Sequence, residues 1–292
     1  MIPVTKSVID AVVTFTEKNL SDKAKEYYRS REWDDSVTSK WHLGFFPEEK
    51  NSELFAEVLK LKFKKEDLKD LRIMNSRWET FFFNRIIIPV YDVHGNAIAI
   101  TGRVLKADGE EWDKHIEGPK YYNSAYDKGK HLFGLNFAIE EIRRLNIVYV
   151  FEGNADVITA HRLGVTNTVG CQGTAFTKEH FALLSRYTKN IVLVFDNDSG
   201  GTTAIGRFNK RSADLKSKDI SSILGTNSVE VRMLIARLRG FKMDPDKFLI
   251  QYGAEKFIET IKTQILDAGL QREYKRIMPP KVVNQYAKKR DV

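Results

Sequence analysis

The sequence predicts an α/β fold: a mixed α+β amino-terminal part, then a parallel sheet with flanking helices, then a helical, basic carboxyl-terminal segment. Three observations support this prediction. Helical patterns fill much of 4–64, β-branched and aromatic runs fill much of 81–105, and apolar runs alternate with amphipathic stretches after residue 145. The 292 residues are enough to bury a substantial core. We expect the following domains: 1–144, 145–250 and 251–292.

The amino-terminal part begins with helical patterns and continues with strands. Ser21 is typical of a helix cap, and Leu54, Val58 and Leu61 share one face of a later helix. The turn residues at 94–96 favour a hairpin between two strand-like runs. Residues 106–130, rich in glycine and charge, are expected to form a loop. The expected helices are 4–19, 21–31 and 52–64, and the expected strands are 81–92 and 97–105.

The second part alternates strands and helices. Short continuous apolar runs separated by helices are typical of a parallel sheet that is covered on both faces. In such sheets the chemistry usually lies at the carboxyl ends of the strands. The expected strands are 147–153, 166–171, 191–198 and 229–236, and the expected helices are 155–164, 177–187 and 201–216.

Acidic residues follow three of these strands. Each group alone is typical of a helix start or cap. Together they would bring up to six negative charges to one edge of the sheet, where they would repel each other unless cations compensated them. Mg²⁺ prefers such oxygen ligands, and paired ions can stabilise both the attacking and the leaving oxygen of a phosphoryl displacement. The sequence therefore predicts metal-assisted chemistry at phosphorus, with these metal-binding candidates: Glu152, Asp156, Asp196, Asp198, Asp244 and Asp246.

Composition and charge exclude several classes of protein. The longest apolar stretches, such as 86–90, are far shorter than the roughly 20 residues of a membrane span, and the first residues do not resemble a secretory leader, so we expect a cytoplasmic protein. The single cysteine, Cys171, excludes an internal disulfide and zinc sites built on paired cysteines. The formal net charge is +8, and 271–292 carries seven basic and two acidic residues. This tail is either a solvated terminus or a nucleic-acid contact.

Several strings of the sequence resemble a known family. FEGNADVITAHRLGVTNTVGCQGTAFTKEHFALLSRYTKNIVLVFDNDSGGTTA is similar to the Toprim fold of DnaG-type primases, type IA and II topoisomerases and some nucleases, with a Glu-Gly after the first strand and Asp-x-Asp after the third. RIIIPVYDVHGNAIAITGRVL, GPKYYNS and KGKHLFGL resemble the amino-terminal part of the DnaG primase catalytic domain specifically. The resemblance covers roughly residues 24–261.

The resemblance implies a DNA primase, a DNA-directed RNA polymerase that makes short RNA primers on single-stranded DNA. It implies catalytic roles for Glu152, Asp196 and Asp198, and Mg²⁺ or Mn²⁺ as cofactor, without zinc. The implied partners are single-stranded DNA, ribonucleoside triphosphates and a replicative helicase, with no membrane, in the cytoplasm of a bacterium or a phage-infected host. The implied nucleotide- and template-binding residues are Arg85, Arg103, Lys120, Tyr121, Asn123 and Lys128. Strand charges that only confer solubility are the alternative interpretation of the two arginines.

The sequence departs from the family pattern in two respects. Gly-Tyr-Met-Asp commonly follows the family's glutamate, whereas Gly153-Asn154-Ala155-Asp156 follows Glu152 here. One cysteine also cannot supply the zinc-binding module with which such primases usually begin, so that module is expected to belong to another polypeptide or to have been removed. Two alternatives stay open: a metal-dependent Toprim nuclease, and a DNA-binding helicase adaptor that works through its basic tail.

Overall fold

The computed structural model describes residues 7–47, 50–105, 118–195, 232–237 and 243–263. The chain forms two compact units, Met1–Asp127 and Lys128–Val292. The division falls before helix α7 (Leu135–Leu145), whereas the expected boundary at residue 144 falls near the end of that helix. Helix α12 (Pro245–Thr263) likewise continues across the expected boundary at 250. The three-part division stays a prediction.

The first unit is built on an antiparallel sheet with the strand order β1-β2-β3-β4. The expected hairpin is confirmed: Arg85 pairs with Val104, and Gly95, with φ of +85°, lies in the turn, where a glycine avoids strain. Strand β4 lies in the segment expected to be a loop, where the sequence pattern is too short to reveal it. The strands are β1 (Gly44–Phe46), β2 (Arg85–Tyr91), β3 (Ala97–Val104) and β4 (Tyr121–Asn123).

Five short helices in the described part of the first unit accompany this sheet, and several of their first turns follow local sequence signals. Ser7 forms a capping box with Asp10 at the start of α1, Ser21 caps α2 through the backbone N–H of Ala24, and Asp34 caps α3. The expected first three helices are confirmed, with α3 and α5 in addition. The helices are α1 (Val8–Lys18), α2 (Asp22–Ser30), α3 (Asp35–Trp41), α4 (Asn51–Lys60) and α5 (Asp67–Asp70).

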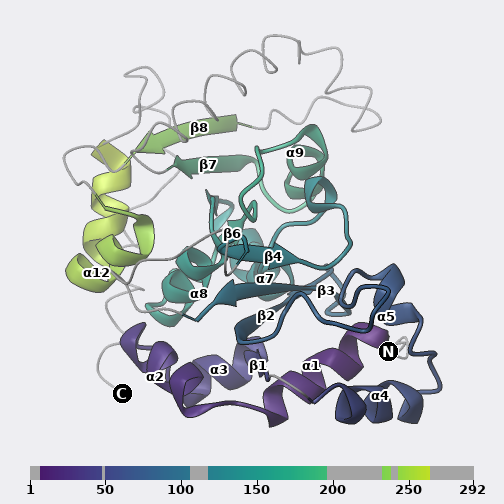
Figure 1. Cartoon of the computed structure of the whole chain (residues 1–292). Coiled ribbons are helices and arrows are strands. Elements are labelled where there is room, and N and C mark those ends of the chain that lie inside the picture. Colours follow the sequence, from purple (N-terminus) through teal and green to yellow (C-terminus); the bar gives the residue numbers. More distant parts are fainter. Residues whose placement is uncertain (1–6, 48–49, 106–117, 196–231, 238–242, 264–292) are drawn as a thin grey trace. The chain divides into compact units, whose positions relative to one another are not determined.

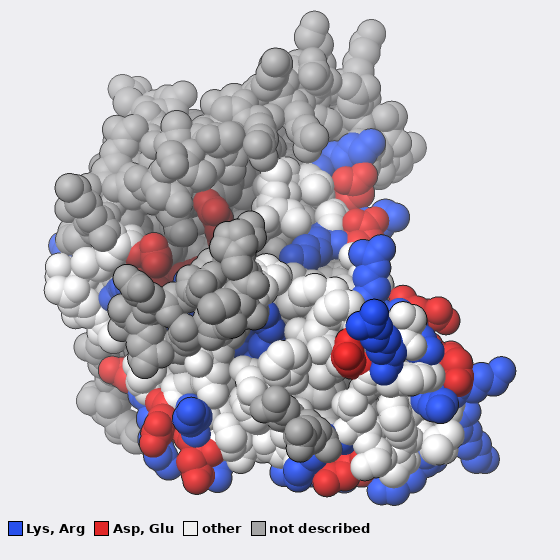
Figure 2. Space-filling view, viewed as in Figure 1, with Lys and Arg blue, Asp and Glu red and all other residues white. Residues whose placement is uncertain are grey.

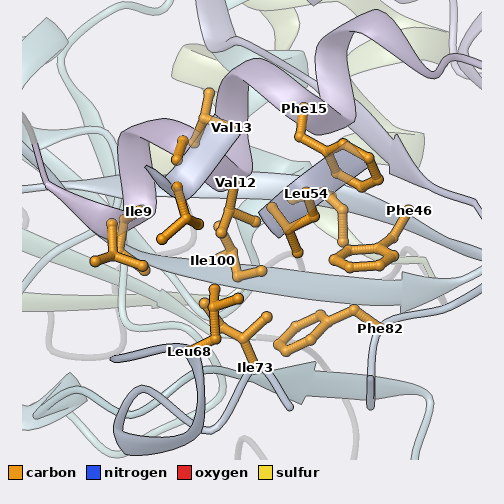
Figure 3. Close-up of a cluster of buried hydrophobic side chains, with 14 of the residues drawn as sticks. Ile9, Val12, Val13, Phe15, Phe46, Leu54, Leu68, Ile73, Phe82 and Ile100 are labelled. Atoms are coloured by element: carbon orange, nitrogen blue, oxygen red, sulfur yellow. The ribbon is translucent and has the colours of Figure 1, made fainter. Parts of the chain in front are cut away.

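The core of the first unit lies between these helices and one face of the sheet. Figure 3 shows Val12 and Phe15 of α1 and Leu54 of α4 pointing toward Phe46 and Ile100 of the strands. All five side chains are buried, with exposed fractions of 1% or less. Burying such apolar area is the main favourable contribution to folding. This packing fixes the position of β2 and β3, which carry candidate site residues.

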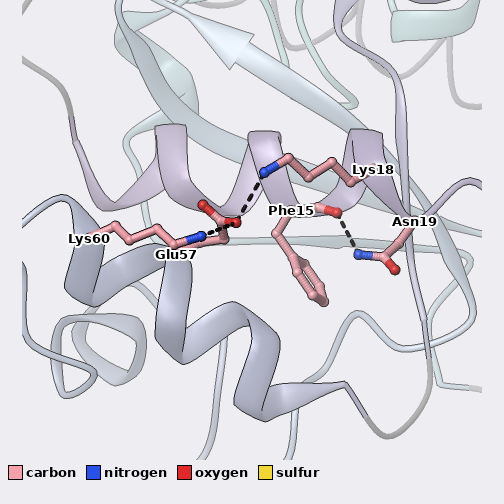
Figure 4. A network of polar contacts seen from close by, with 5 residues as sticks. All are labelled: Phe15, Lys18, Asn19, Glu57 and Lys60. Atoms are coloured by element: carbon pink, nitrogen blue, oxygen red, sulfur yellow. Dashed lines mark hydrogen bonds and ion pairs between the residues drawn. The ribbon is translucent and has the colours of Figure 1, made fainter.

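A polar network joins helices α1 and α4 at the edge of this core. Lys18 of α1 donates to Glu57 of α4 at 3.0 Å, and Lys60 donates to the same carboxylate at 3.1 Å (Figure 4). These hydrogen bonds lower the pKa of Glu57. The Asn19 side chain donates to the Phe15 carbonyl at 2.8 Å and so satisfies a carbonyl in the last turn of α1.

The second unit is built on a parallel sheet with the strand order β6-β5-β7-β8, as the alternating pattern predicts. Helices α8 and α12 contact each other (Figure 1). Aromatic contacts pack α12 against β5, because the ring centre of Phe257 lies 5.9 Å from that of Tyr149 and 5.7 Å from that of Phe151. The expected helix at 201–216 lies outside the described residues. The elements are η1 (Lys128–Lys130), α7, β5 (Val148–Phe151), α8 (Asn154–Arg162), β6 (Thr168–Gly170), α9 (Lys178–Leu184), β7 (Asn190–Phe195), β8 (Arg232–Arg237) and α12.

The described surface carries mixed charge. On the face drawn in Figure 2, acidic side chains are interspersed among the basic ones, and no single sign dominates the described part of that face. The basic segment 271–292 lies outside the described residues. No helix within the described ranges is long and apolar enough to cross a membrane.

Candidate active site at the carboxyl edge of the parallel sheet

Glu152 lies at the carboxyl edge of the parallel sheet of the second unit. It follows Phe151, the last residue of β5, and its side chain is partly buried. Strand β5 pairs in parallel with β7, which ends at Phe195. Asp196 comes next in the chain, but Asp196 and Asp198 lie outside the described residues. Two neighbouring strands thus lead into acidic sequence at one edge.

Asp156 and Asp246 are joined by a hydrogen bond between two helices. The backbone N–H of Asp246, in the first turn of α12, donates to Oδ1 of Asp156 on α8 at 3.1 Å, and the two residues are 3% and 8% exposed, respectively. The positive end of α12 therefore stabilises the negative charge of Asp156. Pro245 opens α12, where a missing N–H costs nothing, and the exposed Asp244 precedes it. The structure brings Asp156 and Asp246 together and leaves the Asp244 side chain at the surface.

Gly153 allows the Asp156 carboxylate to lie against the backbone. A Cβ atom at Gly153 would lie 2.6 Å from Oδ2 of Asp156, which is closer than real Cβ contacts come. The φ of Gly153 is −107°, so the glycine is needed for space and not for its conformational freedom. Any larger residue here would push the carboxylate away from its place.

A tight turn after β6 binds the side chain of a lysine from η1, Lys128, at the same edge of the sheet. Gln172 and Gly173 both have positive φ, and the N–H of Gly173 donates to the carbonyl of Glu152 at 2.9 Å. The carbonyl of Gln172 in turn accepts a hydrogen bond from Nζ of Lys128 at 3.2 Å. Burial lowers the pKa of Lys128. The cationic Lys128 side chain is therefore held on Gln172. The next residue, Gly173, is the one whose N–H binds the Glu152 carbonyl.

Cys171 lies beside this edge and does not take part in its polar chemistry. It is 1% exposed, and its N–H donates to the Phe151 carbonyl at 2.9 Å. Burial raises the pKa of the Cys171 thiol, and the nearby Glu152 carboxylate raises it further. A neutral thiol is a poor metal ligand, so among the described residues the donors at this edge that suit a metal ion are the carboxylate oxygen atoms.

The other basic and polar candidates belong to the first unit. Arg103 pairs with Tyr121, and Thr101 pairs with Asn123, which places these side chains on one face of the antiparallel sheet. Thr101 and Asn123 are hydrogen-bonded at 2.8 Å. Arg103 is 4% exposed, and its guanidinium lies 4.5 Å from the ring centre of Tyr27, a cation–π distance. Tyr121 is 43% exposed.

Arg85 lies on the opposite face of the antiparallel sheet. It pairs with Val104, one register step from Arg103, and it is 6% exposed. Its guanidinium donates to the carbonyls of Pro119 and Lys120 at 2.8 and 3.4 Å. Arg85 thus holds the chain segment that carries Lys120, which is itself exposed. The expected substrate-facing roles of these arginines stay predictions.

The residues at the carboxyl edge fit a hard divalent cation. Glu152 and Asp156 offer carboxylate oxygens, which are the ligands that Mg²⁺ prefers. Within the described ranges, no three carboxylate, imidazole or thiol side chains gather as a metal site. Sequence reasoning missed Asn154, which lies in the chain between Glu152 and Asp156 and is 6% exposed. The departure from the family's Gly-Tyr-Met-Asp pattern was the signal that could have found it.

Comparisons with known proteins agree with both units. Residues 12–139 match the family described as the DNA primase catalytic core, N-terminal domain, and residues 149–249 match the Toprim-like family. The two matched regions together are similar to the catalytic core of the DnaG-type primases. The predicted resemblance and fold class are confirmed, and the family is metal-dependent in general.

The similarity to individual primases extends over most of the chain. The DNA primase of Enterococcus faecalis is 30% identical over 250 residues, which cover 82% of this chain and 36% of that protein. A solved DNA primase domain from Pseudomonas aeruginosa is 26% identical with a TM-score of 0.69, covering 89% of this chain and 79% of that one. A DnaG primase catalytic domain bound to ssDNA has the same fold, with a TM-score of 0.68 at 24% identity, covering 88% of this chain and 80% of that one. The chain spans less than half the length of the curated primases it matches.

Proposed function

We propose that this chain is a primase core that synthesises short RNA primers on single-stranded DNA from ribonucleoside triphosphates. The observation that carries the proposal is the carboxyl edge of the parallel sheet, where Glu152 follows β5 and Asp196 follows the neighbouring β7 in a chain with both primase-core domains. We place its activity in the cytoplasm, with a replicative helicase as partner.

The acidic residues would hold Mg²⁺ or Mn²⁺, and no zinc. We assign the metal-binding role to Glu152, Asp156, Asp196, Asp198, Asp244 and Asp246. The cations would supply neutralisation of the charge on the attacking and leaving oxygens of the displacement. The Asp246 N–H bond keeps the Asp156 carboxylate pointed in one direction. Glu152 is suited to hold the proton of the primer 3′-hydroxyl as that oxygen attacks the α-phosphorus and pyrophosphate leaves.

Basic residues of both units would bind the anionic substrates. Lys128, held on the Gln172 carbonyl beside Glu152, is suited to bind a phosphate of the incoming nucleotide. In the first unit, Tyr121 and Lys120 are exposed and can contact a base and the template backbone. Arg85 supports this segment from within through the Pro119 and Lys120 carbonyls. We assign Arg103 and Asn123, on the Tyr121 face of the sheet, to the same nucleotide- and template-binding surface.

The test is incubation with single-stranded DNA, α-labelled ribonucleotides and Mg²⁺ or Mn²⁺, beside the Asp196→Asn variant. Short labelled ladders on a denaturing gel that disappear in the variant are the expected result. Shortened template without labelled product would replace the proposal by a Toprim nuclease. A blank lane from protein that binds DNA, also after a zinc-binding module is added in trans, would favour the helicase adaptor.

A further inference from the structure

Asn154 is a buried polar residue that the proposed mechanism does not use. It is the first residue of α8 and lies in the chain between Glu152 and Asp156. Only 6% of it is exposed. A side-chain amide in such a place normally finds hydrogen-bond partners, because burying an unpaired polar group costs free energy.

The Asn154 side-chain oxygen does not find one. Its Oδ1 is buried and receives no hydrogen bond from any residue that the structure describes. Two other buried asparagines of this unit donate side-chain hydrogen bonds, Asn167 to the Ile147 carbonyl at 3.0 Å and Asn190 to the Asn146 carbonyl at 2.7 Å, whereas Oδ1 of Asn136, in α7, is buried and has no partner among the described residues, like Oδ1 of Asn154. An unpaired oxygen on a residue that lies in the chain between two acidic residues is suited to a partner from outside the chain.

The chemistry of that partner follows from the neighbours of Asn154. The turn from Glu152 to Asp156 is compact, since the Asp156 carboxylate lies against Gly153. The amino-terminal end of α8 carries a partial positive charge, which would repel a cation. The negative charges of Glu152 and Asp156 offset that repulsion. A neutral amide oxygen adds a ligand without adding repulsion between the carboxylates, and Mg²⁺ is typically held by one or two carboxylates with further oxygens and waters.

We infer that Oδ1 of Asn154 is an additional oxygen ligand, direct or through one bound water, for a divalent cation held by Glu152 and Asp156. The inference rests on the metal site of the proposed function. It assigns to Asn154 a role in metal affinity and not in holding the fold together.

The experiment measures Mn²⁺ binding to the full chain, without DNA or nucleotides, by the electron paramagnetic resonance signal of free Mn²⁺. Asn154→Leu removes the oxygen at similar volume. It should weaken Mn²⁺ binding about 10- to 100-fold, the usual effect of losing a supporting ligand. Its thermal midpoint without metal should be equal to or above that of the wild type, because the unpaired oxygen is gone.

Asn190→Ala is the control, since Asn190 is also buried but is the first residue of β7 and so lies at the opposite edge of the sheet. It should lower the thermal midpoint and leave Mn²⁺ affinity unchanged. If Asn154→Leu does not fold, Asn154→Ala takes its place and should also weaken Mn²⁺ binding, because it removes the same oxygen. Wild-type Mn²⁺ affinity in that variant would overturn the inference.

Asp156→Asn distinguishes the role of Asn154 from the existence of the metal site itself. Wild-type Mn²⁺ affinity in Asn154→Leu together with weakened affinity in Asp156→Asn would overturn the role of Asn154 and leave the metal site standing. Unchanged affinity in both variants would overturn the metal site and the inference with it. Normal Mn²⁺ binding but weakened binding of a ribonucleotide by Asn154→Leu would also overturn the inference, and would assign the oxygen to a nucleotide hydroxyl.

Discussion

Replacement of Gly153 by alanine tests whether Asp156 is held as the structure indicates. The backbone of Gly153, with φ of −107° and ψ of 155°, suits alanine without strain. The new methyl group would lie 2.6 Å from Oδ2 of Asp156. The carboxylate must then retreat by about 0.8 Å to reach an ordinary 3.4 Å contact, and we expect that movement to break the 3.1 Å hydrogen bond that Oδ1 of Asp156 accepts from the Asp246 N–H.

The magnitude follows from the bond that is lost. A hydrogen bond to a charged group contributes about 1.5–3 kcal/mol to the free energy of unfolding. We therefore expect Gly153→Ala to cost about that much. In a chain that already carries Asp156→Ala, the same methyl group meets no carboxylate, so the additional cost should be close to zero. The coupling energy of this double-mutant cycle should be about 1.5–3 kcal/mol.

Urea denaturation followed by circular dichroism measures the four proteins of the cycle. Gly173→Ala is the control: Gly173 has φ of +72°, and its new methyl group would have no neighbouring heavy atom within 4 Å, so its cost of about 1 kcal/mol comes from backbone strain alone. That cost should be the same with and without Asp156→Ala. If Gly153→Ala also costs the same in both backgrounds, the proposed contact with Asp156 is wrong.

Further predictions concern the two cores and the pH dependence of stability. Phe257→Ala should cost about 3–5 kcal/mol in urea denaturation, because its buried ring contacts β5; Tyr252→Ala, 40% exposed, should cost much less. Gly44→Ala should lower the thermal midpoint, at a cost of about 1–3 kcal/mol, because its methyl group would lie 2.7 Å from the α1 backbone, whereas Gly95→Ala meets no neighbour and adds only strain. Burial lowers the pKa of His180 below 6.5, so the unfolded chain binds the proton more readily, and the free energy of unfolding should fall as the pH drops below 6.5. In His180→Gln that fall should be smaller; an equal fall would refute the assignment.

The sequence predicts the elements that carry a strong local pattern. The hairpin around Gly95 and the parallel strands of the second unit follow from apolar runs bounded by turn residues, and both are confirmed. Strand β4 was missed because three residues are too few to show a period, and its pairing with β3 is set by tertiary contact.

The candidate site could be predicted only in part. The position of Glu152 after a strand is a local property of the sequence. The bond between Asp156 and Asp246 joins residues 90 positions apart, and no periodic pattern indicates which backbone N–H a carboxylate will accept from. The burial of Arg85 and Arg103 likewise depends on β2 and β3 being covered on both faces, whereas an isolated hairpin pattern suggests one solvated face.

The 90-residue separation of that hydrogen bond also sets an order of assembly during synthesis. Strand β5 and helix α8 leave the ribosome long before α12. Until the intervening chain has been made, Asp156 therefore lacks the Asp246 N–H that orients its carboxylate. Contacts between residues so far apart form late in folding, because the chain must lose the entropy of closing the long loop before the contact can stabilise it. A chain that ends before α12 would therefore contain every residue from Glu152 to Asp198 and still lack the helix terminus that fixes Asp156.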